Sequence, residues 1–168
     1  ALMSLGHEWR TVDGGVALSA PRSARSTVRL ALPSPELSAL VLLAAARGKP
    51  VVLHGLASTP EIVELAELLN QMGAELAGIG TAVARAGGAT LTGSEARPGA
   101  DRVEALFLLV ASALCGSFVV EGVPAHKMAP ELARLQRAGL TVRAEGAGLV
   151  ASGTPVAFDL AVADDPRP

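Results

Sequence analysis

The chain has 168 residues, half of them apolar and only 2% aromatic, so its core must be built from Leu, Val and Ala. A formal net charge of −2 provides no basic surface for nucleic acid, and the longest apolar runs, 37–46 and 105–114, fall short of the roughly 18–20 residues that cross a membrane. One cysteine excludes an intramolecular disulfide and fits a reducing compartment. We therefore expect a cytoplasmic protein without nucleic-acid or membrane partners.

The first part of the chain is predicted to form short strands. Residues 9–12 and 16–18 flank Asp13-Gly14-Gly15, whose residues tolerate positive φ, so these two segments are expected to pair as a hairpin. Residues 27–32 alternate well enough for a strand, and Pro33 ends it because proline cannot donate a hydrogen bond to a sheet.

Two predicted helices are apolar on every side. The first covers 37–46 and follows Ser34-Pro35-Glu36, in which Ser34 suits the N-cap and Pro35 the first helical position. The second covers 103–114 and is capped by Asp101. A helix without a polar face has to be enclosed, so both are expected to be buried.

Two further helices are amphipathic, and they reveal an internal repeat. The helix predicted over 60–72 ends at Gly73, and the helix predicted over 130–138 ends at Gly139, which lies 66 residues later. A strand precedes each helix and short strands follow it. A period of this length indicates repeated units that stack around a shared core.

The repeat also predicts the domain organisation. Residues 1–88 are expected to hold the end of one repeat domain, and residues 89–168 the start of a second, which finishes with a strand at 156–162. Because the apolar helices must be enclosed, the sheets are expected to lie outside them with one wet face. The predicted fold class is therefore α/β (α+β), with inside-out repeat units that have buried helices and outer sheets.

Two stretches of the sequence resemble a known family. They are Thr59-Pro60-Glu61-Ile62-Val63-Glu64-Leu65 and Ala100-Asp101-Arg102-Val103-Glu104, where the family reads R-E-P-E-I-V-D-L and P-D-R-I-E. The family is the enolpyruvyl transferases, and within it the UDP-N-acetylglucosamine 1-carboxyvinyltransferases. The shikimate-pathway branch, 3-phosphoshikimate 1-carboxyvinyltransferase, opens the first helix with S-R-D-H-T-E and is the weaker match.

The resemblance implies transfer of the enolpyruvyl group of phosphoenolpyruvate to UDP-N-acetylglucosamine, a step of peptidoglycan precursor synthesis that uses no cofactor. Such a reaction needs a general acid, a base and cations for phosphate and carboxylate. The family draws these from an N-terminal Lys-Asn pair, an Arg, a G-C-x-x-G-x-R-P loop and a late Asp, and none of these motifs occurs in this sequence. The chain is therefore expected to correspond to a central fragment of such an enzyme, inactive alone, and no catalytic residue is assigned.

The resemblance also implies substrate-binding residues, each with a purely structural alternative. The strand-to-helix turn Pro33-Ser34-Pro35 matches the family's nucleotide-contacting turn, although Ser34 is equally suited to be a plain N-cap. Glu61 matches a Glu near the cleft, but it can also simply favour the positive helix terminus. Asp101, Arg102 and Glu104 match the D-R-I-E segment, whose alternative is an N-cap followed by a local salt bridge.

Two further interpretations stay open. The chain could be a non-catalytic repeat module that packs on a partner or on a copy of itself through exposed repeat ends, or it could be closer to the shikimate-pathway enzyme. Cys115 follows a buried helix and is expected to be a small core residue. His7, His54 and His126 lack ligand spacing, so no metal site is expected.

Overall fold

The computed structural model describes residues 2–19, 26–31, 34–123 and 125–156. The chain divides into two compact units, Ala1–Pro98 and Gly99–Pro168. Three sequence predictions fall wholly or partly outside the described residues: Pro33, the last residue of the strand predicted at 27–32, and all but the first residue of the strand predicted at 156–162.

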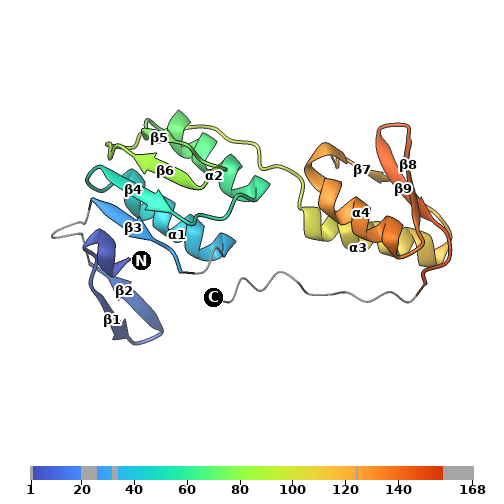
Figure 1. Ribbon diagram of the computed structural model, residues 1–168, viewed down its shortest axis with the longest axis horizontal. Coiled ribbons are helices and arrows are strands. Elements are labelled where there is room, and N and C mark those ends of the chain that lie inside the picture. Colours follow the sequence, from blue (N-terminus) through green and yellow to red (C-terminus); the bar gives the residue numbers. More distant parts are fainter. Residues whose placement is uncertain (1, 20–25, 32–33, 124, 157–168) are drawn as a thin grey trace. The chain divides into compact units, whose positions relative to one another are not determined.

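The first unit combines a hairpin, a mixed sheet and two helices (Figure 1). The hairpin follows a short 3-10 helix, η1, and its two strands pair antiparallel as predicted. The larger sheet has the order β3-β4-β6-β5, in which only β3 and β4 run parallel. The elements are η1 (Met3–Leu5), β1 (Trp9–Val12), β2 (Gly15–Leu18), β3 (Thr27–Arg29), α1 (Pro35–Ala46), β4 (Val51–His54), α2 (Pro60–Gln71), β5 (Leu76–Ala77) and β6 (Val83–Ala86).

Helix α1 makes the parallel pairing of β3 and β4 possible, because parallel neighbours need a crossover connection. Its buried Ser38 ties the helix to the loop after β4, since Ser38 Oγ accepts a hydrogen bond of 2.8 Å from the Ala57 amide. The core of the unit joins both helices to one face of the sheet, with Leu42, Leu53 and Leu69 among its most deeply buried side chains.

Alternation along the strands shows which face of the sheet is covered. In β4 the side chains of Val51 and Leu53 are buried, whereas those of Val52 and His54 are only partly buried. In β6 Ala84 and Ala86 are buried and the intervening residues are exposed. One face therefore packs on the helices and the other is largely wet, as predicted for an outer sheet.

The second unit places two helices against a small antiparallel sheet of order β7-β9-β8 (Figure 1). Its core is centred on Leu109 and Met128, which are both fully buried. Strand β9 is buried along most of its length because it lies between its two neighbours and against α3. The elements are α3 (Arg102–Cys115), β7 (Val120–Glu121), η2 (Ala125–Met128), α4 (Ala129–Arg137), β8 (Thr141–Glu145) and β9 (Gly148–Ser152).

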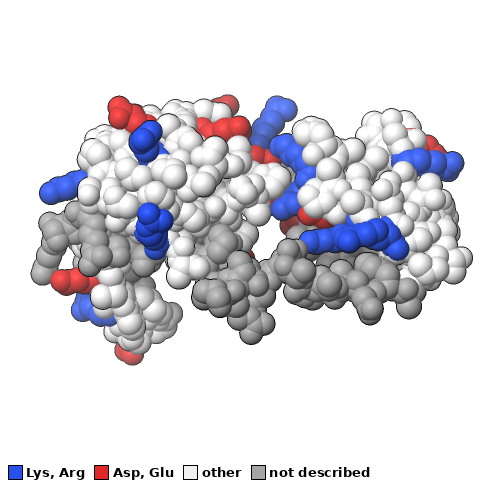
Figure 2. Space-filling view, in the orientation of Figure 1, with Lys and Arg blue, Asp and Glu red and all other residues white. Residues whose placement is uncertain are grey.

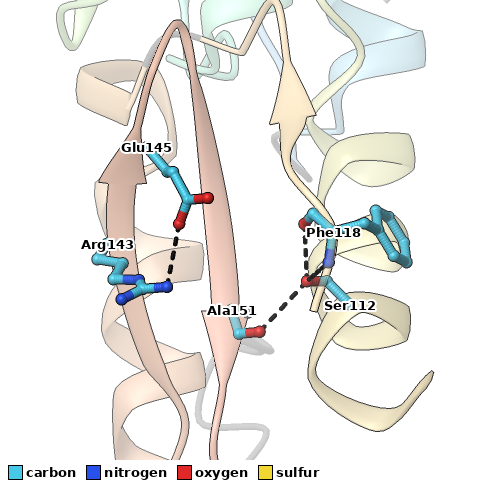
Figure 3. Close-up of polar contacts among 5 residues, drawn as sticks. All are labelled: Ser112, Phe118, Arg143, Glu145 and Ala151. Atoms are coloured by element: carbon cyan, nitrogen blue, oxygen red, sulfur yellow. Dashed lines mark hydrogen bonds and ion pairs between the residues drawn. The ribbon is translucent and has the colours of Figure 1, made fainter. Parts of the chain in front are cut away.

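A buried serine connects the C-terminal part of α3 to the sheet. Figure 3 shows Ser112 Oγ between the backbones of Phe118 and Ala151. It accepts a hydrogen bond of 3.0 Å from the Phe118 amide and lies 2.8 Å from the Phe118 carbonyl oxygen and 3.2 Å from that of Ala151. The Arg143–Glu145 pair in the same figure is more than half exposed, so it contributes little to stability.

Within its own unit, each of the two apolar helices, α1 and α3, is buried on one side only. The prediction that both helices are buried on every side is therefore wrong for the separate units. In α1, Leu40 is 48% exposed, and in α3, Phe107 is 73% exposed. The reason is that a single unit supplies one sheet and one other helix, which can cover only one side of each apolar helix.

Candidate functional site

The first predicted site residue, Ser34, is the N-cap of α1. Its Oγ accepts a hydrogen bond of 3.1 Å from the Leu37 amide, and Pro35 follows at the first helical position. Ser34 is half-buried and Pro35 is exposed. The cap that the sequence predicts is confirmed, and a contact with a nucleotide stays a prediction.

Glu61 lies in the first turn of α2 with its side chain exposed. Thr59 is the N-cap by backbone geometry, but its side chain makes no capping bond. The Thr59 Oγ1 atom is buried and has no hydrogen-bond partner among the described residues. A carboxylate in the first turn favours the positive end of the helix whether or not it contacts a substrate.

Asp101, Arg102 and Glu104 come together at the start of α3. Asp101 caps the helix, with its Oδ1 accepting hydrogen bonds of 2.8 Å from the Val103 amide and 3.1 Å from the Glu104 amide. Asp101 and Glu104 are both exposed. The segment therefore presents two carboxylates at a helix N-terminus, a combination that can accept hydrogen bonds from the hydroxyls of a ligand.

Arg102 is not an exposed cation. Its Nη1 donates a hydrogen bond of 2.6 Å to Glu131 Oε1, and the two side chains are 18% and 15% exposed. The partner lies 29 residues away, in the first turn of α4. This salt bridge connects two helices, so it differs from the local one considered from the sequence.

Glu131 is a residue that the sequence analysis did not select. A signal existed in the sequence, because a Pro-Glu pair lies in the first turn of both α2 (Pro60-Glu61) and α4 (Pro130-Glu131). The side chain of Glu131 is mostly buried, and its Oε2 has no hydrogen-bond partner among the described residues.

The prediction for Cys115 is wrong. Its side chain is exposed at the last residue of α3, where the helix ends at Gly116 with a left-handed φ of 111°. The core of the second unit takes residues from the face of α3 that carries Ala105, Leu109 and Ser112, and position 115 lies off that face.

Within the described parts of the chain, no three His, Cys, Asp or Glu side chains form a group that could hold a metal ion. No described helix has the length and apolar character needed to cross a bilayer. On the face drawn in Figure 2, basic and acidic side chains are interspersed among neutral ones in both units.

Comparison with known proteins identifies the family. A sequence model of the family described as EPSP synthase (3-phosphoshikimate 1-carboxyvinyltransferase) matches residues 3–167. The chain belongs to this family. The resemblance to enolpyruvyl transferases that the segments 59–65 and 100–104 indicate is thereby confirmed.

Curated members of the EPSP synthase family refine the relationship. UDP-N-acetylglucosamine 1-carboxyvinyltransferase of Hyphomonas neptunium is 32% identical over 164 residues, which is 93% of this chain and 38% of the relative. UDP-N-acetylglucosamine 1-carboxyvinyltransferase 2 of Carboxydothermus hydrogenoformans is 36% identical over 143 residues, 83% of this chain and 34% of the relative. The chain thus spans between a third and two fifths of the length of these relatives.

Solved structures of the family confirm the predicted fold class. The enolpyruvyl transferase NikO of Streptomyces tendae superposes with a TM-score of 0.73 at 21% identity, covering 90% of this chain and 40% of that protein. EPSP synthase of Acinetobacter baumannii gives a TM-score of 0.58 at 18% identity, with 89% of this chain covered and 36% of that one. At these identities the comparison concerns the fold alone.

Proposed function

We propose that this chain forms part of an enzyme that transfers enolpyruvyl from phosphoenolpyruvate to UDP-N-acetylglucosamine, in the cytoplasmic synthesis of peptidoglycan precursors. The observation that carries the proposal is the identity of 32–36% to relatives named UDP-N-acetylglucosamine 1-carboxyvinyltransferase, over most of this chain. Because the family's Lys-Asn, Cys-loop and late Asp motifs do not occur in the sequence, the chain by itself should bind substrate weakly and not turn it over.

The proposed contacts follow the predicted residues. The turn Pro33-Ser34-Pro35 would lie against the nucleotide. Each unit offers exposed carboxylates that can accept hydrogen bonds from ligand hydroxyls: Glu61 in the first unit, and Asp101 and Glu104 in the second, where Arg102 belongs to the same segment. Charge-assisted hydrogen bonds of this kind are stronger than neutral ones, so even part of a site can give measurable binding.

We predict that titration calorimetry will detect UDP-N-acetylglucosamine binding to the full 168-residue chain and none of shikimate 3-phosphate. A phosphate-release assay with phosphoenolpyruvate and UDP-N-acetylglucosamine should show no turnover. Tighter binding of shikimate 3-phosphate than of UDP-N-acetylglucosamine would contradict the proposed substrate and favour the shikimate-pathway branch of the family. Turnover by the chain alone would contradict the expectation that it is inactive.

A second proposal concerns self-association, and one feature of α3 favours it. The apolar residues Val103, Phe107, Val110 and Leu114 are spaced by four, three and four positions, which places them along one side of the helix. Val103 and Leu114 are each 62% exposed and Phe107 is 73% exposed. Since the stripe carries no charge, two copies can bury it against each other in an isologous contact.

We predict that sedimentation velocity will show a concentration-dependent dimer that Phe107→Asp abolishes. The matched control is Val16→Asp on β2, because Val16 is 63% exposed but lies in the other unit, so this variant should dimerise like the unmodified chain. A Phe107→Asp chain that still dimerises, or a chain that stays monomeric throughout, would exclude this contact.

A further inference from the structure

The ion pair between Arg102 and Glu131 fixes the start of one helix to the start of another. The contact of 2.6 Å joins the first residue of α3 to the first turn of α4, and both side chains are more than four fifths buried. A mostly buried pair with a short charge-assisted hydrogen bond has one favoured geometry. Any displacement of the α3 N-terminus therefore has to break it.

The pair lies next to the cap of α3. Asp101 precedes Arg102 directly, and its Oδ1 is already held by the amides of Val103 and Glu104. The orientation of the Asp101 carboxylate thus follows the position of the α3 N-terminus, which the Arg102–Glu131 pair sets. Asp101 remains exposed, whereas Arg102 and Glu131 do not.

Comparison of the two units shows that this repeat can fold without the pair. In the first unit, Pro35 is the first residue of the apolar helix, where the second unit has Arg102, and proline offers no cation. The 66-residue shift that relates the two units matches Glu131 with Leu65 of α2, whose side chain carries no charge. A contact demanded by the repeat fold itself would be expected in both units, and it is present in only the second.

Glu131 also carries an energetic cost that stability does not explain. Its Oε2 is buried without a hydrogen-bond partner among the described residues. Burying an unsatisfied carboxylate oxygen opposes folding, and such groups in native proteins call for a functional reason. Holding Arg102 in place is the role that the geometry offers.

We propose that Arg102 and Glu131 are positioning residues, which set the Asp101 carboxylate for the nucleotide sugar and do not themselves contact it. The inference rests on the proposed function and deepens it. Asp101 is the residue that contacts the ligand, whereas Arg102 and Glu131 act on binding by holding Asp101 in position. It predicts that loss of the pair acts on binding through Asp101.

The test is a double-mutant cycle on the full chain, with binding of UDP-N-acetylglucosamine followed by amide chemical shifts at residues 101–104. Asp101→Asn removes the charge but keeps a good N-cap, so the helix start is preserved. Asp101→Asn should weaken binding about tenfold, the loss that corresponds to one charge-assisted hydrogen bond. Glu131→Gln should weaken it similarly, and the double variant should be no weaker than either single one.

The outcomes separate the positioning role from the proposed function. If the unmodified chain shows no shift at residues 101–104, the proposed function of this segment fails. If it binds and the Asp101→Asn and Glu131→Gln losses multiply, or Glu131→Gln has no effect, the positioning role is overturned. If Glu131→Gln also disrupts the second unit, this will be seen as a loss of amide chemical-shift dispersion. In that case the charge-reversed double variant Arg102→Glu with Glu131→Arg provides the test. A positioning pair should regain binding when its two charges are exchanged, and failure to regain it in a folded chain would overturn the positioning role.

Discussion

Replacing Leu109 by Ala is expected to lower the free energy of unfolding of the second unit by about 2–5 kcal/mol, the range for large-to-small changes in well-packed cores. Leu109 is fully buried at the centre of α3, where it packs in a core that includes Val120 and Leu149. Truncation removes its contacts and leaves a cavity. A small unit has few other core residues with which to compensate.

The control is the neighbouring leucine. Leu108 is 40% exposed on the same helix, so Leu108→Ala has the same effect on helix propensity and on chain composition but removes much less buried surface. We expect it to cost about 1 kcal/mol or less.

Hydrogen exchange of the α3 and β9 amides is the suitable measurement, because it reports the second unit separately. Trp9, the only tryptophan, lies in β1 of the first unit and would not report on this one. Equal losses for the two leucine variants would contradict the core assignment.

Replacing Gly88 by Ala is expected to destabilise the first unit by about 2–5 kcal/mol, from two sources that add. Gly88 has a φ of +72°, and a left-handed conformation costs an L-residue roughly 1–2 kcal/mol. A Cβ at this position would also clash with the Gly48 carbonyl oxygen. That oxygen belongs to the backbone, so relief requires a shift of the chain, which costs about 1–3 kcal/mol more.

The close approach has a structural purpose. Immediately after Gly88, the Ala89 amide donates a hydrogen bond of 3.0 Å to the carbonyl oxygen of Ala46, the last residue of α1. The segment after β6 thus satisfies one of the terminal carbonyls of α1, and a side chain at Gly88 would push it away.

Gly80→Ala separates the two sources of the effect. Gly80 has a similar φ of +81°, but its added Cβ would meet only a methyl group of Val63 at 3.7 Å, an ordinary contact. We expect this variant to lose only the conformational term of roughly 1–2 kcal/mol. Urea unfolding of the first unit, followed by circular dichroism and by exchange of the β4 and β6 amides, would show the difference. Similar losses for both variants would exclude the steric contribution.

Predictions that depend on neighbouring residues in the sequence are confirmed by the structure. Ser34 and Asp101 cap their helices through amides two or three residues further on. Gly73 and Gly139 follow helices with φ of +100° and +84°, as expected for helix-ending glycines. These features are predictable because the interacting groups lie within a few residues of each other.

Predictions that depend on packing were less successful. The apolar composition of α1 and α3 indicated burial, but Leu40 and Phe107 are exposed because no element of their own unit reaches those sides. Cys115 has a side chain of a type that is usually buried, yet its position on the last turn leaves it in solvent.

By itself, the sequence determined the approximate extents of the helices, the fold class and the enolpyruvyl transferase resemblance, since these depend on local chemistry and on the order of residues. Only the tertiary structure decided that Arg102 is paired with Glu131 and that Asp101 and Glu104 are the exposed carboxylates of the segment. A bond across 29 residues forms because α3 and α4 start side by side, and that proximity arises when both helices pack on the same sheet.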